Sequence, residues 1–381
     1  MTELLSPTIQ YPAMPGAARV RLRDLSVNDP DERRKLHETL DRFLDHGMWI
    51  LGPEVLEFER FTAARFNRRF CVGVSSASSG LYLALKALEI GPGDEVITTP
   101  MSWLVTSSAI LLAGASPVFV DVDHHYNLDP DCVEQAITRR TKAILPVHFY
   151  GRVAAMTEIM TIARKHGLRV IEDVAQAVGA ELLGTPAGSF GDIGVLSFSP
   201  MKVVPSLGDA GAVICDDEAV ADRVRSLRYC GTVHAEICIE PELKHTIDAL
   251  QAAVIVQNLN RAGEIIESRR RLARRYLSRL SQVVVCPDLG EERRHTMYDF
   301  TIRTRHRPRV IEHLISNRIE TKVRHPILIS DQPIYRHLPR PKLPNAEHFV
   351  QQILCLPMHQ NLTDSDIDFV CDRLLDCEML F

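Results

Sequence analysis

Short apolar runs alternate with helical stretches along the first half of this 381-residue chain. The runs are rich in β-branched residues, and the stretches between them repeat apolar residues at helical spacing. Strands separated by helices of this length form a mostly parallel sheet that is covered on both faces. We therefore predict an α/β fold with strands at 70–74, 95–99, 117–120, 143–147 and 169–171 and helices at 78–88, 102–113, 130–137 and 154–165.

The pattern changes at both ends of this alternating region. Two amphipathic helical stretches, 31–46 and 53–67, precede it. One long helical stretch at 248–282 follows, and short strands such as 299–303 come after it. We interpret the long helix as a connector between a large domain and a smaller C-terminal α+β domain. The predicted division is an N-terminal arm at 1–30, a large domain at 31–258 and a small domain at 259–381.

A lysine and an aspartate carry the clearest chemical signal. Lys202 lies between the run 195–199 and a glycine-rich turn, and Asp173 ends the apolar run 168–171. Pyridoxal 5'-phosphate needs an amine that forms a Schiff base with its aldehyde and a carboxylate that keeps its ring nitrogen protonated. We predict Lys202 as the catalytic amine and Asp173 as the partner of the ring nitrogen, so that 31–258 is a cofactor-binding domain. The alternative is an ordinary loop acid and a surface lysine.

A serine-rich run indicates where the phosphate of this cofactor binds. Ser76, Ala77 and Ser78 lie between a predicted strand and the start of a helix. Backbone N–H groups and hydroxyls at a helix N-terminus bind phosphate well. A serine N-cap is the alternative explanation for such a run. Ser197, shortly before Lys202, is a further candidate for a hydrogen bond to the phosphate.

Two more side chains are candidates for contacts with the pyridine ring. Trp103 follows a predicted strand end and can stack flat on the ring, although a core tryptophan is the alternative. Gln176, shortly after Asp173, can donate to the phenolic oxygen of the ring. These residues and His148 follow the carboxyl ends of predicted parallel strands, where ligands bind in open α/β sheets.

Composition excludes several other classes of protein. A net charge of −5 and a pI near 6.3 give no reason to expect a nucleic-acid or acidic-membrane partner. No apolar run has the length of a membrane span and the N-terminus lacks a signal pattern, so we expect a cytoplasmic protein. The nine cysteines form no Cys-x-x-Cys pair and the histidines lack ligand spacing, so neither a metal site nor a disulfide framework is expected.

The ordered set of motifs resembles the DegT/DnrJ/EryC1/StrS family of sugar aminotransferases. The segments that carry the resemblance are Gly52-Pro53-Glu54-Val55, Gly91-Pro92-Gly93-Asp94-Glu95-Val96, Asn127-Leu128-Asp129-Pro130, Pro146-Val147-His148-Phe149-Tyr150-Gly151, Glu172-Asp173-Val174-Ala175-Gln176, Gly191-Asp192-Ile193-Gly194, Ser197-Phe198-Ser199-Pro200-Met201-Lys202 and Leu356-Pro357-Met358-His359.

The resemblance implies the fold type I architecture of pyridoxal phosphate enzymes, with a seven-stranded, mostly parallel sheet. It also implies a homodimer with active sites at the subunit interface, and amino transfer from glutamate or glutamine to a keto sugar. Relatives with histidine in place of the lysine are dehydratases, and Lys202 therefore favours transamination. A keto cyclitol is the alternative acceptor, and a cofactor-binding regulator is a more remote alternative. The acceptor, ring position, stereochemistry, nucleotide carrier and pathway cannot be read from the sequence.

Two segments depart from the pattern of the family. Where relatives have Asn-Gly-Thr, this chain has Ser76-Ala77-Ser78, which keeps a hydroxyl and loses the glycine. Where relatives have Asn-Tyr-Arg-Met, with the asparagine on the neighbouring subunit's phosphate, this chain has Lys244-His245-Thr246-Ile247. We predict Lys244 as a charged replacement for the asparagine, with loss of the contact as the alternative. The missing arginine favours an atypical acceptor.

Overall fold

The structure is a computed structural model that describes residues 13–234, 236–290 and 292–377. Residues 1–12 of the predicted N-terminal arm lie outside the described residues. The helices are α1 (Pro30–His46), α2 (Pro53–Arg65), α3 (Ala77–Ala87), α4 (Val105–Leu112), α5 (Pro130–Gln135), α6 (Met156–His166), α7 (Glu218–Arg228), α8 (Ala249–Asn260), α9 (Ala262–Leu280), α10 (Arg307–Ser316), α11 (Pro344–Gln352) and α12 (Asp364–Leu375), with 3₁₀ turns η2 (Phe149–Gly151), η3 (Ile329–Asp331) and η4 (Pro333–Tyr335). The strands are β1 (Phe70–Val74), β2 (Glu95–Thr98), β3 (Ser116–Phe119), β4 (Thr141–Leu145), β5 (Arg169–Asp173), β6 (Glu181–Leu182), β7 (Thr185–Pro186), β8 (Ile193–Ser197), β9 (Gly211–Cys215), β10 (Thr232–Val233), β11 (Ile237–Cys238), β12 (Arg293–Arg294), β13 (Phe300–Arg303) and β14 (Ile353–Leu356).

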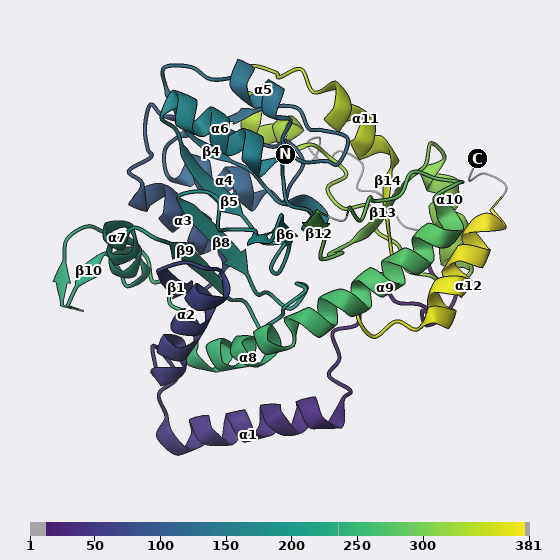
Figure 1. Cartoon of the computed structure of the whole chain (residues 1–381), viewed down its shortest axis with the longest axis horizontal. Coiled ribbons are helices and arrows are strands. Elements are labelled where there is room, and N and C mark those ends of the chain that lie inside the picture. Colours follow the sequence, from purple (N-terminus) through teal and green to yellow (C-terminus); the bar gives the residue numbers. More distant parts are fainter. Residues whose placement is uncertain (1–12, 235, 291, 378–381) are drawn as a thin grey trace.

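A seven-stranded sheet in the order β1-β9-β8-β5-β4-β2-β3 forms the centre of the molecule (Figure 1). Strand β9 runs antiparallel to both of its neighbours, and the pairs from β8 to β3 are parallel. The prediction of a mostly parallel, seven-stranded sheet is confirmed. The sequence analysis did not predict β9, which returns the chain after the Lys202 loop.

Alternate residues of the central strands pack on opposite faces of the sheet. Ile144 and Val170 belong to an apolar core that includes side chains of α2, α6 and α8. Their neighbours Leu145 and Ile171 belong to a second core that includes side chains of α3, α4 and α7. Because both faces are covered, the strands read as continuous apolar runs, as parallel sheets require.

The predicted long helix at 248–282 is interrupted. Helices α8 and α9 follow one another end to end with a break at Arg261 (Figure 1). The Arg261 amide donates to Asn258 at 3.1 Å, three residues earlier, so the last turn of α8 is tighter than an α-helix. Helix α9 then leads to a third apolar core made with β13, β14, α10 and α12. The predicted domain boundary at residue 258 stays a prediction.

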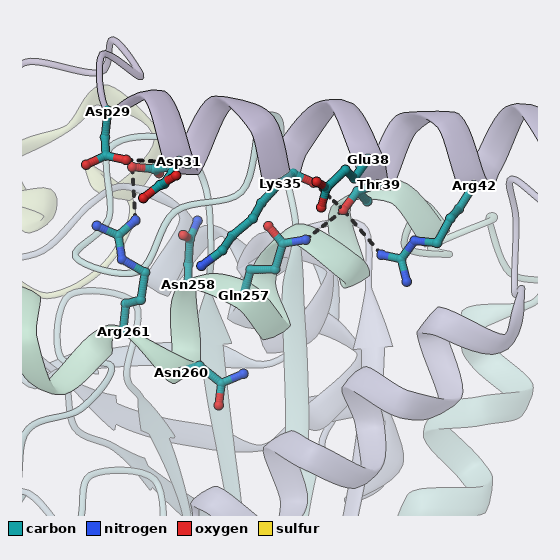
Figure 2. A pocket seen from close by; sticks show the side chains of 11 residues that line it. Asp29, Asp31, Lys35, Glu38, Thr39, Arg42, Gln257, Asn258, Asn260 and Arg261 are labelled. Carbon is teal, nitrogen blue, oxygen red and sulfur yellow. Dashed lines mark hydrogen bonds and ion pairs between the residues drawn. The ribbon is translucent and has the colours of Figure 1, made fainter.

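Helix α1 lies along α8 (Figure 1). It begins at the N-cap Asp29, whose carboxylate accepts from the Glu32 amide, and ends at Gly47 in the left-handed conformation. Figure 2 shows the polar seam between the two helices, where Gln257 donates to the Thr39 hydroxyl at 2.7 Å. A groove of about 750 Å³ runs along this seam.

Among the described helices, none has the length and hydropathy that crossing a bilayer requires.

Candidate active site

A cavity of about 480 Å³ lies at the carboxyl ends of the parallel strands. Lys202 lies on its wall, in the loop that joins β8 to β9. The amide of Lys202 donates to Ser199 at 2.9 Å, and its Nζ lies 5.1 Å from the centre of the Tyr298 ring. The sequence-predicted residues that line this one cavity are Ser76, Ala77, Ser78, Trp103, Asp173, Gln176, Ser197 and Lys202. Their roles toward a cofactor remain predictions.

Asp173, the last residue of β5, is buried and faces this cavity. Its carboxylate accepts from the Thr106 hydroxyl at 2.9 Å and from the Ala175 amide at 3.0 Å. Burial raises the pKa of Asp173, although these hydrogen bonds and the charge of Lys202 act in the opposite direction. A buried carboxylate of this kind gains stability from a cationic partner, and the N–H of a pyridinium ring is one. The site therefore fits the predicted cofactor at its nitrogen.

His148 and Glu172 hold the strand end that carries Asp173. The His148 amide donates to the Asp173 carbonyl at 3.1 Å. The ring accepts from the Ala154 amide at Nδ1, so Nε2 carries the proton and donates to Glu172 at 2.9 Å. Burial acts to raise the pKa of Glu172, but His148 and backbone N–H groups outweigh it and leave that pKa lowered. This buried network holds the backbone at Asp173 in position.

The serine-rich loop forms the N-terminus of α3. The Ser76 hydroxyl accepts from the Ser79 amide at 3.2 Å, so Ser76 is the N-cap of the helix. Ala77 and Ser78 then occupy the first turn, where backbone N–H groups have no partner within a helix. Both line the cavity, together with the positive end of the helix dipole. The capping interpretation is thus correct for Ser76, and phosphate binding by the neighbouring N–H groups stays a prediction.

Gly211, the first residue of β9, sets the position of this loop. A Cβ on Gly211 would lie 2.5 Å from the carbonyl carbon of Ser76 and 2.6 Å from the Ala77 nitrogen. Both are backbone atoms, so Gly211→Ala must push the loop away. We expect the dissociation constant of pyridoxal phosphate to rise at least about tenfold, measured by absorbance titration of the apoprotein. Gly91→Ala is the control, because its nearest contact is 3.5 Å away. Equal affinity of the two variants would contradict the prediction.

Trp103 and Gln176 take positions that suit contacts with the ring. Trp103 is 63% exposed on the cavity wall, with its ring 6.2 Å from that of His325. It is therefore not a core tryptophan in the isolated subunit. The side-chain oxygen of Gln176 accepts from the Tyr150 amide at 2.9 Å. The Gln176 amide nitrogen is consequently the end that can donate to a ligand.

Lys244 is the predicted residue that the structure does not bring to this cavity. It is exposed, and its Nζ lies 5.9 Å from the Tyr229 ring. The next residue, His245, reaches the serine-rich loop instead: its Nδ1 lies 3.0 Å from the Ser79 hydroxyl, and its carbonyl accepts from Ser75 at 2.8 Å. A contact of Lys244 with the phosphate of a neighbouring subunit stays a prediction.

Sequence reasoning missed the part of the wall that the C-terminal half of the chain supplies. Tyr298, Lys322, Arg324 and His325 all line the cavity with Lys202. It also missed Thr106, the hydrogen-bond partner of Asp173. No local motif marks these residues, because they reach the site through contacts between distant segments.

The comparisons with known proteins agree with this geometry. A family model described as the DegT/DnrJ/EryC1/StrS aminotransferase family matches residues 30–375. A UDP-N-acetyl-3-dehydro-α-D-glucosamine 3-aminotransferase of Acidithiobacillus ferrooxidans is 37% identical over 90% of this chain and 94% of its own length. A crystal structure of DesV of S. venezuelae in complex with a ketimine intermediate has 35% identity and a TM-score of 0.90, covering 94% of this chain and 98% of that one. A crystal structure of NtdA of Bacillus subtilis with the bound cofactor PMP has 30% identity and a TM-score of 0.85, covering 97% of this chain and 91% of that one.

Proposed function

Since the chain belongs to the DegT/DnrJ/EryC1/StrS aminotransferase family, we propose that it moves an amino group from glutamate or glutamine to a nucleotide-linked keto sugar in amino-sugar biosynthesis. It is an aminotransferase that depends on pyridoxal 5'-phosphate, as its family and its relatives indicate. The observation that carries the proposal is the single cavity that holds Lys202, Asp173 and the first turn of α3.

Each part of this cavity suits one part of the cofactor. Asp173 would hold the ring nitrogen, and the N–H groups of Ala77 and Ser78, with Ser197, would hold the phosphate. Trp103 would stack on the ring, and Gln176 would donate to its phenolic oxygen. When bound, the cofactor supplies an aldehyde that accepts the amino group and a ring that withdraws electrons from the donor's α-carbon.

Lys202 is the residue that we propose to carry protons between the substrates. Its Nζ would hold the cofactor through the aldehyde carbon and would become a free amine when the amine of the donor takes that position. As a free amine it would take the proton from the donor's α-carbon as general base and give it to the former aldehyde carbon of the cofactor as general acid. Asp173, oriented by Thr106 and Ala175, would supply the negative charge beside the ring nitrogen.

The test follows the two half-reactions separately. L-glutamate should convert the cofactor absorbance of the holoenzyme from the aldehyde form to the amine form. UDP- and dTDP-linked keto sugars should then restore the aldehyde form, and inosose-type ketones should not. Restoration by the inosose alone would contradict the proposed acceptor and favour a keto cyclitol. No conversion by any amino donor would contradict the proposed reaction.

We further propose a homodimer that closes this cavity from outside. Large apolar side chains are exposed on α1 and in the loop after it, including Leu44, Met48 and Trp49. The β10–β11 ribbon, which projects from the body in Figure 1, exposes Ile237. Patches of this kind mark association surfaces. Sedimentation at assay concentration should give twice the mass of the chain, and a monomer that is fully active would contradict the proposal.

A cytoplasmic location is the remaining part of the proposal. The nine cysteines are free thiols in the structure. Free thiols are typical of proteins in a reducing compartment.

A further inference from the structure

One wall of the cavity carries positive charge that the proposed cofactor does not use. It is formed by the segment from Lys322 to His325, which pairs with β14 through hydrogen bonds between Lys322 and Cys355. His325 then turns the chain with a φ of 51°, in the left-handed region that non-glycine residues rarely adopt. Backbone strain of this kind collects at ligand sites, where the surrounding structure enforces it.

Arg324 holds the central position in this wall. Its side chain is 12% exposed, and its Nε lies 2.6 Å from Asp299 Oδ2. Its guanidinium carbon lies 5.3 Å from the centre of the Tyr298 ring. Its Nη2 is buried and has no hydrogen-bond partner among the described residues. A buried guanidinium nitrogen without an acceptor is costly, so an acceptor supplied by a ligand would be well placed here.

The ion pair with Asp299 does not fully balance the positive charge of Arg324. Asp299 already has Arg23 as a partner, with an Nη2–Oδ1 distance of 2.6 Å. Two guanidinium groups therefore face one carboxylate, which leaves a surplus of positive charge beside the cavity. His325 adds none, because burial and the charge of Arg324 lower its pKa to about 4. The surplus favours an anionic ligand, and a guanidinium fork matches a carboxylate.

The position of Arg324 relative to Lys202 points to the ligand. Lys202 Nζ and Arg324 Cζ lie 5.1 and 5.3 Å from the centre of the same Tyr298 ring. In the proposed reaction the amine of the donor takes the place of Lys202 Nζ, and its carboxylates lie a few bonds from that amine. On the basis of the proposed function, we propose that Arg324 binds a carboxylate of the substrates, namely the side-chain carboxylate of the amino donor, and so selects an acidic donor. The other source of a carboxylate is an acidic acceptor sugar.

The experiment compares Arg324→Gln and Arg324→Lys with the wild-type holoenzyme. Arg324→Gln should raise the dissociation constant of L-glutamate, from single-turnover changes in cofactor absorbance, at least about tenfold, with a smaller change in the limiting rate. Arg324→Lys keeps the charge beside Asp299 but loses the fork, so an intermediate effect is expected. Arg305→Gln removes an exposed arginine that does not line the cavity. It should leave the dissociation constant of L-glutamate and the limiting rate unchanged.

Further arms separate the two sources and the two proposals. Glutarate, which has no amino group, should bind the wild-type holoenzyme in calorimetry and bind Arg324→Gln at least about tenfold more weakly. A loss confined to uronic acid nucleotides, with glutamate unaffected, would support the carboxylate site and assign it to the acceptor. Unchanged affinities for all three ligands in both variants would overturn the inference and leave the proposed function standing. Glutarate binding that depends on Arg324, in an enzyme that transfers no amino group, would support the carboxylate site and contradict the proposed function.

Discussion

Lys202→Ala should remove amino transfer altogether while the protein stays folded. The variant loses both the amine that binds the cofactor covalently and the base that moves the proton from the donor. Loss of the proton carrier alone costs about 10²- to 10⁴-fold, so turnover should fall below detection in a coupled assay. The absorbance band of the covalently bound cofactor should also vanish. The Lys202 side chain lines the cavity, and no hydrogen bond joins its Nζ to another of the described residues, so stability should change little.

The matched control for this variant is Lys165→Ala. Lys165 is exposed on α6, pairs with Glu134 at 2.6 Å and does not line the cavity. The variant Lys165→Ala removes the same type of side chain, and it should keep full activity and the absorbance band. If Lys202→Ala exchanged amino groups at the wild-type rate, the assignment of Lys202 would be wrong.

Asp173→Asn should lower turnover much more than it lowers cofactor affinity. Asparagine keeps the shape of the side chain but loses the charge that holds the proton on the ring nitrogen. At an effective dielectric of about 20, a carboxylate about 4 Å from a pyridinium contributes about 4 kcal/mol. That energy corresponds to a loss in kcat of about 10³-fold. Steady-state kinetics and a cofactor titration of the same preparation measure the two effects.

The apoprotein should respond to Asp173→Asn in the opposite direction. The pKa of Asp173 is raised in the fold by burial, so its ionised form lowers stability as the pH rises past the ordinary aspartate value of about 3.9. Near neutral pH the apo variant should therefore be at least as stable as the apo wild type, and the stabilisation by the cofactor should be smaller in the variant. Thermal unfolding with and without cofactor measures both. A variant that is much less stable than the wild type in the apo form would contradict this account of Asp173.

Much of the central sheet could be predicted because each strand carries a local signal. Strands such as β4 and β5 are buried on both faces, and their apolar runs are visible without any tertiary information. The closeness of Asp173 and Lys202 was predictable for a related reason. Parallel strands bring their carboxyl ends to one edge, so Asp173 at the end of β5 and Lys202 after β8 were expected to lie near each other.

The rest of the site depends on contacts that no local pattern encodes. Thr106 meets Asp173 through the packing of α4 against the sheet, and Arg324 arrives through pairing of its segment with β14. The break at Arg261 was missed because the helical pattern continues on both sides of it. The contact of His245 with the serine-rich loop was also missed, because it joins segments that are far apart in the sequence. The prediction for Lys244 concerns a neighbouring subunit, which a single chain does not contain.

The most direct test reduces the holoenzyme with borohydride and maps its peptides by mass spectrometry. Reduction fixes the bond between the cofactor and the amine that holds it. The account predicts a single modified peptide, the one that contains Lys202, and no modification in Lys202→Ala. A cofactor fixed to another lysine, or a wild-type protein in which the Lys202 peptide stays unmodified after incubation with pyridoxal phosphate, would contradict it.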